Sequence, residues 1–214
     1  MPLKPKLPKV SIPVEARKIV AFDFDGTLTY KDSFTAFLRM QCGDARIAGV
    51  LATKPGILLD YVRTKDRGAL KSRLIYNLLG PLAQEELETR IQAFVTKTGR
   101  RLFRPDALKA WTEHNQPDRL RVIVTASPDI LVRPFGQMIG ADRVIGTKLG
   151  FSADGRLLPD LDGVNCRGEE KMCRLREAFG EDMVLDSAYG DTKGDREMIA
   201  AAQNGFYRVF KERP

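Results

Sequence analysis

The sequence predicts an α/β fold: a mainly parallel sheet with a helical cap inserted after the first strand. From residue 18 onward, short apolar runs that suit buried strands alternate with segments of helical spacing. Between residues 32 and 104 this alternation stops, and only segments of helical spacing occur. Strands that alternate with helices indicate a parallel sheet covered by helices, and the interruption indicates a helical insertion.

The elements of the sheet domain follow in order along the chain. We expect strands at residues 18–23, 120–125, 143–147, 183–190 and 206–210, and helices at residues 128–138, 168–179 and 195–203. Ser127 is a candidate N-cap, with Pro128 at the first helical position. Residues 148–159 suit a hairpin with an Asp-Gly turn.

The insertion has segments of helical spacing at residues 31–40, 67–80 and 83–99. Pro-Gly at 55–56 and Gly-Pro at 80–81 separate them. We therefore divide the chain into a flexible Pro- and Lys-rich tail (1–17), a core (18–31 and 105–214) and a helical cap (32–104).

Length and composition limit the class of protein. The chain has 214 residues, of which 43% are hydrophobic, enough for one sizeable core with a small inserted domain. No apolar run approaches the ~20 residues of a membrane span, and the N-terminal residues lack the apolar region of a signal peptide. Cys42, Cys166 and Cys173 form neither a disulfide framework nor a zinc motif. We expect reduced thiols in a cytoplasmic protein.

Positive charge is concentrated in the insertion. The net charge is +7, and the segment from Lys31 to Asp106 holds fourteen basic and eight acidic residues, a surplus of +6. Such an excess points to an anionic partner: nucleic acid, a lipid headgroup or a phosphorylated metabolite. Apolar pieces of the insertion lie beside basic residues, namely Arg46, Lys54, Arg63, Lys65 and Arg67. Peripheral contact with an anionic membrane is one expectation, and a buried cap core is the alternative.

Acidic and hydroxyl side chains follow three of the expected strands. Asp23 ends the first strand, Thr125 the second, and Asp191 a third, with Asp195 four residues later. Because the carboxyl ends of parallel strands meet at one edge of a sheet, we expect these groups to share a crevice. Crowded carboxylates repel one another unless a hard cation such as Mg²⁺ lies between them, and Mg²⁺ also binds phosphate oxygens. The pattern therefore predicts Mg²⁺ held against a phosphate.

The two aspartates of the first strand suit phosphoryl transfer. A carboxylate such as Asp23 can attack phosphorus and form an aspartyl-phosphate. Asp25 lies two residues on and points to the same side, because side chains alternate along extended chain. It can protonate the leaving oxygen and then activate water.

Four segments in order resemble the signatures of the haloacid dehalogenase-like (HAD) phosphatases. They are DFDGTLT at 23–29, VIVTAS at 122–127, Lys171, and GDTKGD at 190–195. A lone Asp-x-Asp is weak, but seven matching residues with a distant acidic motif are specific. The resemblance covers about two thirds of the chain and implies a Rossmann-like core, Mg²⁺ and hydrolysis of a phosphomonoester.

The resemblance also implies roles for particular residues. Asp23 would be the nucleophile, Asp25 the general acid/base, and Lys171 the cation that stabilises charge, with Arg167 as the alternative to Lys171. Asp23, the backbone carbonyl of Asp25 and Asp191 would bind Mg²⁺, and Asp195 would support the metal directly or through water. The phosphate would contact Thr125, Ala126 and Ser127.

The position of the insertion is similar to the cap of the phosphoserine phosphatase-like subgroup (IB). Asp32 stands near the position of that subgroup's cap glutamate, and Arg73 near that of its cap arginine. Ala126, Ser127 and Pro128 replace a Gly-Gly pair, and this departure argues against phosphoserine as the substrate. The segments TASP, NCRGEEK and YGDTKGDRE are closer to the phosphatidylglycerophosphatase C-like branch.

Three functions remain open. The first is a phosphatase acting on phosphatidylglycerophosphate, cytoplasmic and at the inner face of the membrane. The second is a hydrolase of a small soluble phosphomonoester, such as phosphoserine. The third is a non-catalytic nucleic-acid-binding protein, against which the sequence shows no zinc finger, no RNA-recognition aromatics and no helix-turn-helix.

Overall fold

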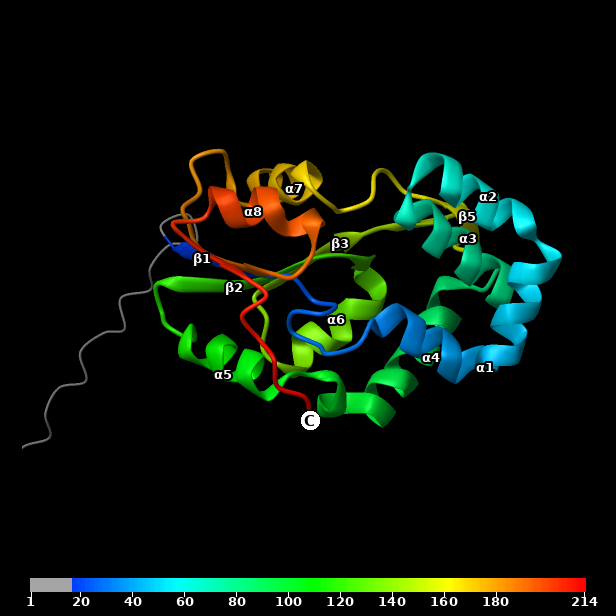
Figure 1. Ribbon diagram of the computed structural model, residues 1–214, viewed down its shortest axis with the longest axis horizontal. Helices are drawn as coiled ribbons and strands as arrows, with labels where there is room; N and C mark the ends of the chain where they lie inside the picture. The colour runs from blue at the N-terminus through cyan, green and yellow to red at the C-terminus, as the bar shows by residue number, and fades with distance from the viewer. Residues whose placement is uncertain (1–16) are drawn as a thin grey trace, which may run out of the picture.

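A five-stranded parallel sheet forms the centre of the protein, which we describe from a computed structural model over residues 17–214 (Figure 1). Its order is β3-β2-β1-β6-β7. The strands are β1 (Lys18–Phe22), β2 (Arg119–Pro128), β3 (Arg143–Thr147), β6 (Leu185–Gly190) and β7 (Asn204–Tyr207). The predicted α/β fold with a mainly parallel sheet is confirmed. The predicted tail lies outside the described residues, apart from Arg17.

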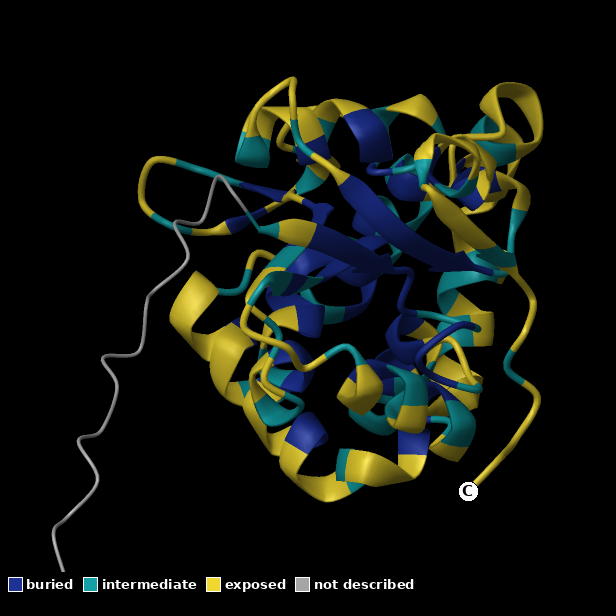
Figure 2. Cartoon of the chain, turned by 90° about the vertical axis from the view of Figure 1, so that its left-hand side faces the viewer, coloured by how far each residue is buried: buried dark blue, intermediate teal, exposed yellow. Residues whose placement is uncertain are grey.

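Helices cover both faces of the sheet. On one side lie α7 (Glu169–Phe179) and α8 (Arg196–Ala201), and on the other lie α5 (Pro105–Glu113) and α6 (Asp129–Met138) (Figure 1). Alternate residues of β1 supply the two cores: Ile19 and Ala21 pack in the cluster of α7 and α8, and Val20 and Phe22 in the other. Figure 2 shows the sheet strands largely buried between helices with exposed outer faces. This burial gives the site at the strand ends a rigid base.

The helical insertion follows β1. It comprises α1 (Ser33–Thr53), α2 (Pro55–Thr64), α3 (Arg67–Leu79) and α4 (Gln84–Thr98), followed by the short 3₁₀ helix η2 (Gly99–Leu102). Helix α1 kinks at Gly43, whose φ is 74°. Within residues 17–214, no helix has the length and apolar character needed to cross a membrane. The division at residues 104 and 105 remains a prediction about domains.

A hairpin from the later part of the chain packs on the insertion. It consists of β4 (Leu149–Phe151) and β5 (Leu157–Leu161), and its turn includes the predicted Asp-Gly pair. The Leu157 N–H donates to the Leu82 carbonyl at 2.8 Å, and the Gln84 N–H to the Gly155 carbonyl at 2.9 Å. Gly68 of α3 lies so close to β5 that a Cβ there would meet the Leu161 side chain at 2.9 Å. The hairpin therefore fastens α3 and the start of α4 to the core.

Several details differ from the sequence-based expectation; the last strand, for example, is Asn204–Tyr207 instead of residues 206–210, and helix α2 was not among the expected segments. Strand β2 extends to Pro128 instead of ending at Thr125, and it pairs irregularly with β3 between Val124 and Pro128. As a result α6 starts at Asp129, and Ser127 does not cap it, because its side chain is used elsewhere. The last helix, α8, is shorter than predicted, since a 3₁₀ turn, η3 (Lys193–Asp195), precedes it.

Candidate active site

Two adjacent strand ends bring the acidic residues together. Asp23 follows β1 directly and Asp191 follows β6, the neighbouring strand in the sheet. Gly26 makes the turn after β1 with a φ of +90°, and a Cβ there would lie 2.4 Å from an Asp191 carboxylate oxygen. Glycine therefore satisfies both the backbone conformation and the close approach of the two loops.

A buried lysine links two of the carboxylates. Lys171 extends from the first turn of α7, and its Nζ donates to Asp23 Oδ1 at 2.7 Å and to Asp195 Oδ1 at 2.6 Å. The third donor reaches the Val124 carbonyl at 2.6 Å, so all three ammonium protons have partners. Lys171 is 1% exposed. Burial alone would lower its pKa, but the two carboxylates outweigh burial and raise the pKa above its usual value.

The two carboxyl groups that Lys171 joins differ in their protonation equilibria. Burial raises the pKa of Asp23 to about 7, with the nearby carboxyls of Asp195 and Asp25 adding to the rise and Lys171 opposing it. For Asp195, burial also acts upward, but Lys171 and the hydrogen bonds from Thr192 outweigh it and lower the pKa. The site thus carries more negative charge than one lysine neutralises.

Three carboxylates have the geometry of a cation site. Asp23, Asp191 and Asp195 each offer a ligand oxygen, and these oxygens lie within 4.8 Å of one another. Burial raises the pKa of Asp191, with Asp195 adding to the rise, as expected for carboxyls that repel each other without a cation. An all-oxygen, carboxylate-rich donor set is the kind that Mg²⁺ prefers. The residues present therefore fit the predicted metal.

The side chain of Asp25 points to another part of the site. Its Oδ1 accepts from the Ser33 N–H at 2.6 Å, and its Oδ2 accepts from the Ser127 hydroxyl. Burial raises the pKa of Asp25, with Lys71 opposing the rise. A carboxyl group with a raised pKa retains its proton to higher pH, which suits a general acid. Asp25 therefore has different hydrogen-bond partners from the three clustered carboxylates.

The end of β2 supplies the expected hydroxyl groups. Thr125 is buried, and its Oγ1 accepts from the Ser127 N–H at 3.0 Å. The carbonyl of Ala126 accepts from Thr147 Oγ1 at 3.1 Å, which fixes this loop against β3. All three predicted phosphate-binding residues of the loop line one cavity together with Asp23 and Asp25.

The insertion closes this cavity with a second lysine. Lys71 of α3 donates to Ser127 Oγ at 2.9 Å and pairs with Asp32 Oδ2 at 3.5 Å. Asp32 is also the N-cap of α1, where it accepts from the Thr35 N–H. The cavity has a volume of about 90 Å³. It is lined by Asp23, Asp25, Asp32, Arg67, Lys71, Thr125, Ala126, Ser127, Arg167, Lys171, Thr192, Gly194 and Asp195.

Of the two arginines that the sequence analysis proposed for the site, one lines this cavity and the other does not. Arg167, the alternative to Lys171, lines it but donates to neither Asp23 nor Asp195. Arg73 lies outside it: its guanidinium pairs with Asp60 and lines a different cavity between α2 and α3. The structure therefore does not support the expectation that Arg73 contacts substrate.

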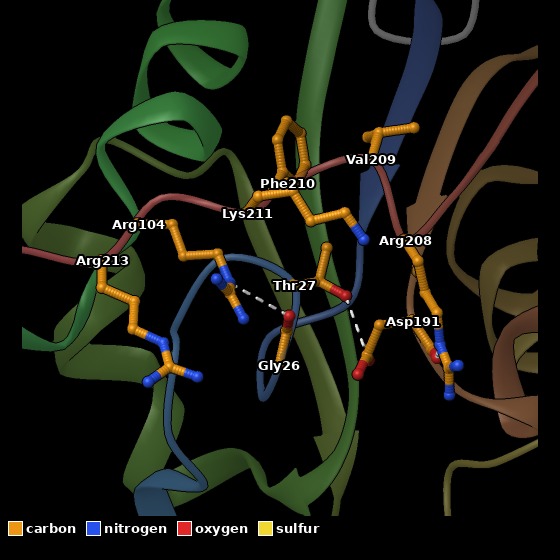
Figure 3. Close-up of a pocket in the computed structure, with 10 residues that line it drawn as sticks. Gly26, Thr27, Arg104, Asp191, Arg208, Val209, Phe210, Lys211 and Arg213 are labelled. Carbon is orange, nitrogen blue, oxygen red and sulfur yellow. Dashed lines mark hydrogen bonds between the residues drawn. The ribbon is translucent and has the colours of Figure 1, made fainter.

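Sequence reasoning missed Lys71, Arg67 and the side chain of Thr27. Thr27 Oγ1 donates to Asp191 Oδ1 at 3.3 Å and lies 3.4 Å from Asp23 Oδ2, so it connects β1 and β6 (Figure 3). Arg67 and Lys71 are four residues apart and share a helix face, whereas Arg73 is two residues from Lys71 and faces away. Helical spacing alone could have grouped the first two, but not shown which face meets the core.

A family model and a curated relative both match most of this chain. The family described as haloacid dehalogenase-like hydrolase matches residues 20–200. Protein CicA of Caulobacter vibrioides (strain NA1000 / CB15N) is 47% identical over 196 residues, which is 92% of this chain and 88% of CicA.

Solved structures share the fold at lower identity. A protein of unknown function from Bordetella pertussis Tohama I has a TM-score of 0.69 at 22% identity, covering 86% of this chain and 87% of that one. A phospho-aspartyl intermediate analogue of phosphoserine phosphatase has a TM-score of 0.54 at 22% identity, covering 92% and 95%. At these coverages each match includes at least part of the insertion as well as the sheet.

Proposed function

This chain belongs to the haloacid dehalogenase-like hydrolase family, and we propose that it is a Mg²⁺-dependent phosphomonoester hydrolase with Asp23 as nucleophile. One observation carries the proposal: the carboxylates of Asp23 and Asp25 line the same phosphate-sized cavity, and each is held by different partners. The neighbour described as a phospho-aspartyl intermediate analogue shares this fold, which supports the same covalent route here.

In the first step an Asp23 carboxylate oxygen attacks phosphorus. A bond forms between that oxygen and phosphorus, while the bond from phosphorus to the leaving oxygen breaks. Lys171 orients Asp23 through its 2.7 Å hydrogen bond and favours the ionised carboxylate. Asp25, whose raised pKa keeps a proton available, gives it to the leaving oxygen.

In the second step water attacks the phosphorus of the aspartyl-phosphate. Asp25, now ionised, accepts a proton from that water, and the bond between phosphorus and Asp23 breaks to release phosphate. Ser127 and Ser33 hold Asp25 in place for both steps. Lys71 and Asp32 line the cavity from the insertion, and movement of the insertion over bound substrate would exclude bulk water.

Asp23 and Asp191, with Asp195 directly or through water and the backbone carbonyl of Asp25, would hold Mg²⁺. The cation would neutralise negative charge that develops on the phosphoryl oxygens and lower the pKa of Asp23. Thr27 would keep Asp191 oriented for this role.

Replacing Asp23 tests the reaction. Asp23→Asn keeps the shape of the side chain but removes the nucleophile, so hydrolysis of p-nitrophenyl phosphate should fall to background while the fold persists. Asp182→Asn is a matched control, because Asp182 is exposed and does not line the cavity. Undiminished turnover by Asp23→Asn would refute the mechanism.

For the substrate, we propose a lipid phosphomonoester of the phosphatidylglycerophosphate type. Helix α2 exposes large apolar side chains, with Leu58 at 41%, Leu59 at 68% and Val62 at 59% exposure. Basic residues flank them, namely Lys54, Arg63 and Lys65. This arrangement suits an anionic bilayer, with each charge near its surface contributing about 1 kcal/mol. The enzyme would then act in the cytoplasm, at the inner face of the membrane.

A vesicle experiment separates this substrate from a small soluble phosphomonoester. The chain should sediment with vesicles that contain phosphatidylglycerol, and Leu58→Ser/Leu59→Ser/Val62→Ser should abolish sedimentation. Val164→Ser/Val184→Ser is the control, since these exposed apolar residues lie on the core. No lipid binding, with rapid turnover of phosphoserine, would favour the soluble substrate. DNA binding without Mg²⁺-dependent hydrolysis would instead indicate a nucleic-acid-binding protein.

A further inference from the structure

A second cavity lies beside the acidic cluster, on the side of the C-terminal segment. It has a volume of about 310 Å³, against about 90 Å³ for the catalytic cavity. Its lining is Gly26, Thr27, Arg104, Gly190, Asp191, Arg208, Val209, Phe210, Lys211 and Arg213. Figure 3 shows Arg104 and Arg213 on one side of Gly26 and Thr27, and Arg208 on the other side beside Asp191.

The charge of this cavity is opposite to that of the catalytic cluster. Four basic side chains line it, those of Arg104, Arg208, Lys211 and Arg213, and the single carboxylate among the lining residues is that of Asp191. That carboxylate accepts a hydrogen bond from Thr27 at 3.3 Å and therefore already has a partner. The cavity has a surplus of three positive charges.

Fixed contacts hold the segment that carries these cations. The N–H groups of Lys211 and Glu212 donate to Asp106 Oδ2 at 2.6 and 3.0 Å. The ring of Phe210 stacks on Tyr189, with ring centroids 5.4 Å apart. Arg208 has a φ of 56°, a conformation that side-chain-bearing residues rarely adopt without such restraints. The basic groups are thus placed by the fold and are not a loose tail.

Most of the hydrogen-bond donors in this cavity have no protein acceptor. Arg104 donates two hydrogen bonds, from Nε to the Gly26 carbonyl at 3.2 Å and from Nη1 to the Glu212 carbonyl at 3.0 Å. Arg208 donates one hydrogen bond, from Nε to the Asp191 carbonyl at 2.6 Å. Within residues 17–214, the side chains of Lys211 and Arg213 make no hydrogen bond or ion pair. A guanidinium has five N–H donors in a planar fork, so both arginines can still bind an oxyanion.

We propose that this cavity is a second anion-binding site that takes a small phosphate-bearing anion. Arginine and lysine groups converging on one concave surface recognise phosphate by charge-assisted hydrogen bonds. The volume leaves room for a phosphate with a small organic group, at the lower end of ligand-sized pockets. Recognition there depends on protein cations, so binding requires no divalent metal. The proposal does not depend on the chain's catalytic activity.

Calorimetric titration in EDTA tests the site with two probes, inorganic phosphate and glycerol 3-phosphate. The catalytic cavity is lined by both carboxylates and cations, so the loss of binding caused by variants of the basic cavity, measured without a divalent cation, reports on the basic cavity. We expect Lys211→Gln/Arg213→Gln to weaken binding about tenfold or more, since two charged partners are lost. Tighter binding of glycerol 3-phosphate identifies an organic phosphate as the ligand, and equal binding identifies inorganic phosphate.

A control with the same change in charge makes the result specific. Lys97→Gln/Lys109→Gln removes two exposed cations of α4 and α5 that do not line the cavity, and should leave binding unchanged within about twofold. Equal loss in both double variants, or no loss in Lys211→Gln/Arg213→Gln, would overturn the proposal. Thermal melts verify folding, and Arg213→Gln alone carries the test if the double variant does not fold.

Discussion

Two lysines face the same cavity from opposite walls, and their environments differ. Lys171, from the core, is 1% exposed and makes ion pairs of 2.7 and 2.6 Å with two buried carboxylates. Lys71, from the insertion, has a side chain that is 22% exposed and pairs with Asp32, itself 42% exposed, at 3.5 Å. We call the side formed by Lys171, Asp23 and Asp195 the core wall, and the side formed by Lys71 and Asp32 the cap wall. The ion pairs of the core wall are short and buried, whereas the ion pair of the cap wall is longer and partly exposed to solvent.

This difference indicates a division of labour. A buried pair is costly to break, because the remaining partner stays charged in a medium that solvates it poorly. A partly exposed pair contributes little to stability and can exchange its partner for a ligand oxygen. We therefore expect the core wall to carry the chemistry and stability of the site, and the cap wall to carry substrate contact.

The largest effect should come from the core wall. Lys171→Met leaves Asp23 and Asp195 buried without their counter-ion, and we expect the free energy of unfolding to fall by about 3–5 kcal/mol. Turnover of p-nitrophenyl phosphate should fall by about a hundredfold to a thousandfold. Chemical denaturation and steady-state kinetics measure the two effects. Arg167→Met is the comparison, and a greater loss of turnover there would make Arg167 the catalytic cation.

The acidic cluster should also make stability depend on pH. In EDTA, the raised pKa of Asp23, about 7 against 3.8 for an ordinary aspartate, means that the folded state binds more protons than the unfolded state between those values. Stability should therefore fall as pH rises through this window, by up to about 1.4 kcal/mol per pH unit.

The difference between the wild type and Asp23→Asn isolates this contribution. In EDTA, the free energy of unfolding should fall less steeply from pH 4 to 8 for Asp23→Asn than for the wild type. Saturating Mg²⁺ should flatten the wild-type curve, because the cation favours the ionised carboxylate. Parallel curves for both proteins would place the titration elsewhere.

The cap wall should give a smaller and different effect. Lys71→Met removes a contact to Ser127 and Asp32 but no deeply buried ion pair. We expect KM to rise about tenfold, as for the loss of one charged contact, with stability changed by less than about 0.5 kcal/mol. Arg73→Met, on the other face of α3, should leave KM unchanged. If Arg73→Met raised KM more, the placement of the cap face would be wrong.

The same two walls show what sequence reasoning could and could not predict. The order of strands along the chain and the carboxylates at their ends predicted which core residues converge, because parallel strand ends meet at one edge. For the cap, the sequence gives helices but not their rotation or the face that meets the core. The sequence therefore predicts Arg73 as the cap residue of the site, whereas Lys71 lines the cavity.

Long-range contacts explain the remaining differences. Ser127 follows an apolar strand and precedes a helix, which is the usual place for an N-cap, yet its hydroxyl donates to Asp25. Nothing local in the sequence reveals that partner, which lies 102 residues away. The hairpin turn at Asp154 and Gly155 was predictable, but its hydrogen bonds to Leu82 and Gln84, at the start of α4, were not, since they join segments from different parts of the chain.

The covalent intermediate is the most direct test of the account. Asp25→Asn should still be phosphorylated by p-nitrophenyl phosphate, whose leaving group needs little help from an acid, but should lose the base that activates water. After an acid quench, mass spectrometry of tryptic peptides should find a phosphoryl group on Asp23, in the peptide of residues 19–31. Phosphate on another residue, or none during active turnover, would contradict the account.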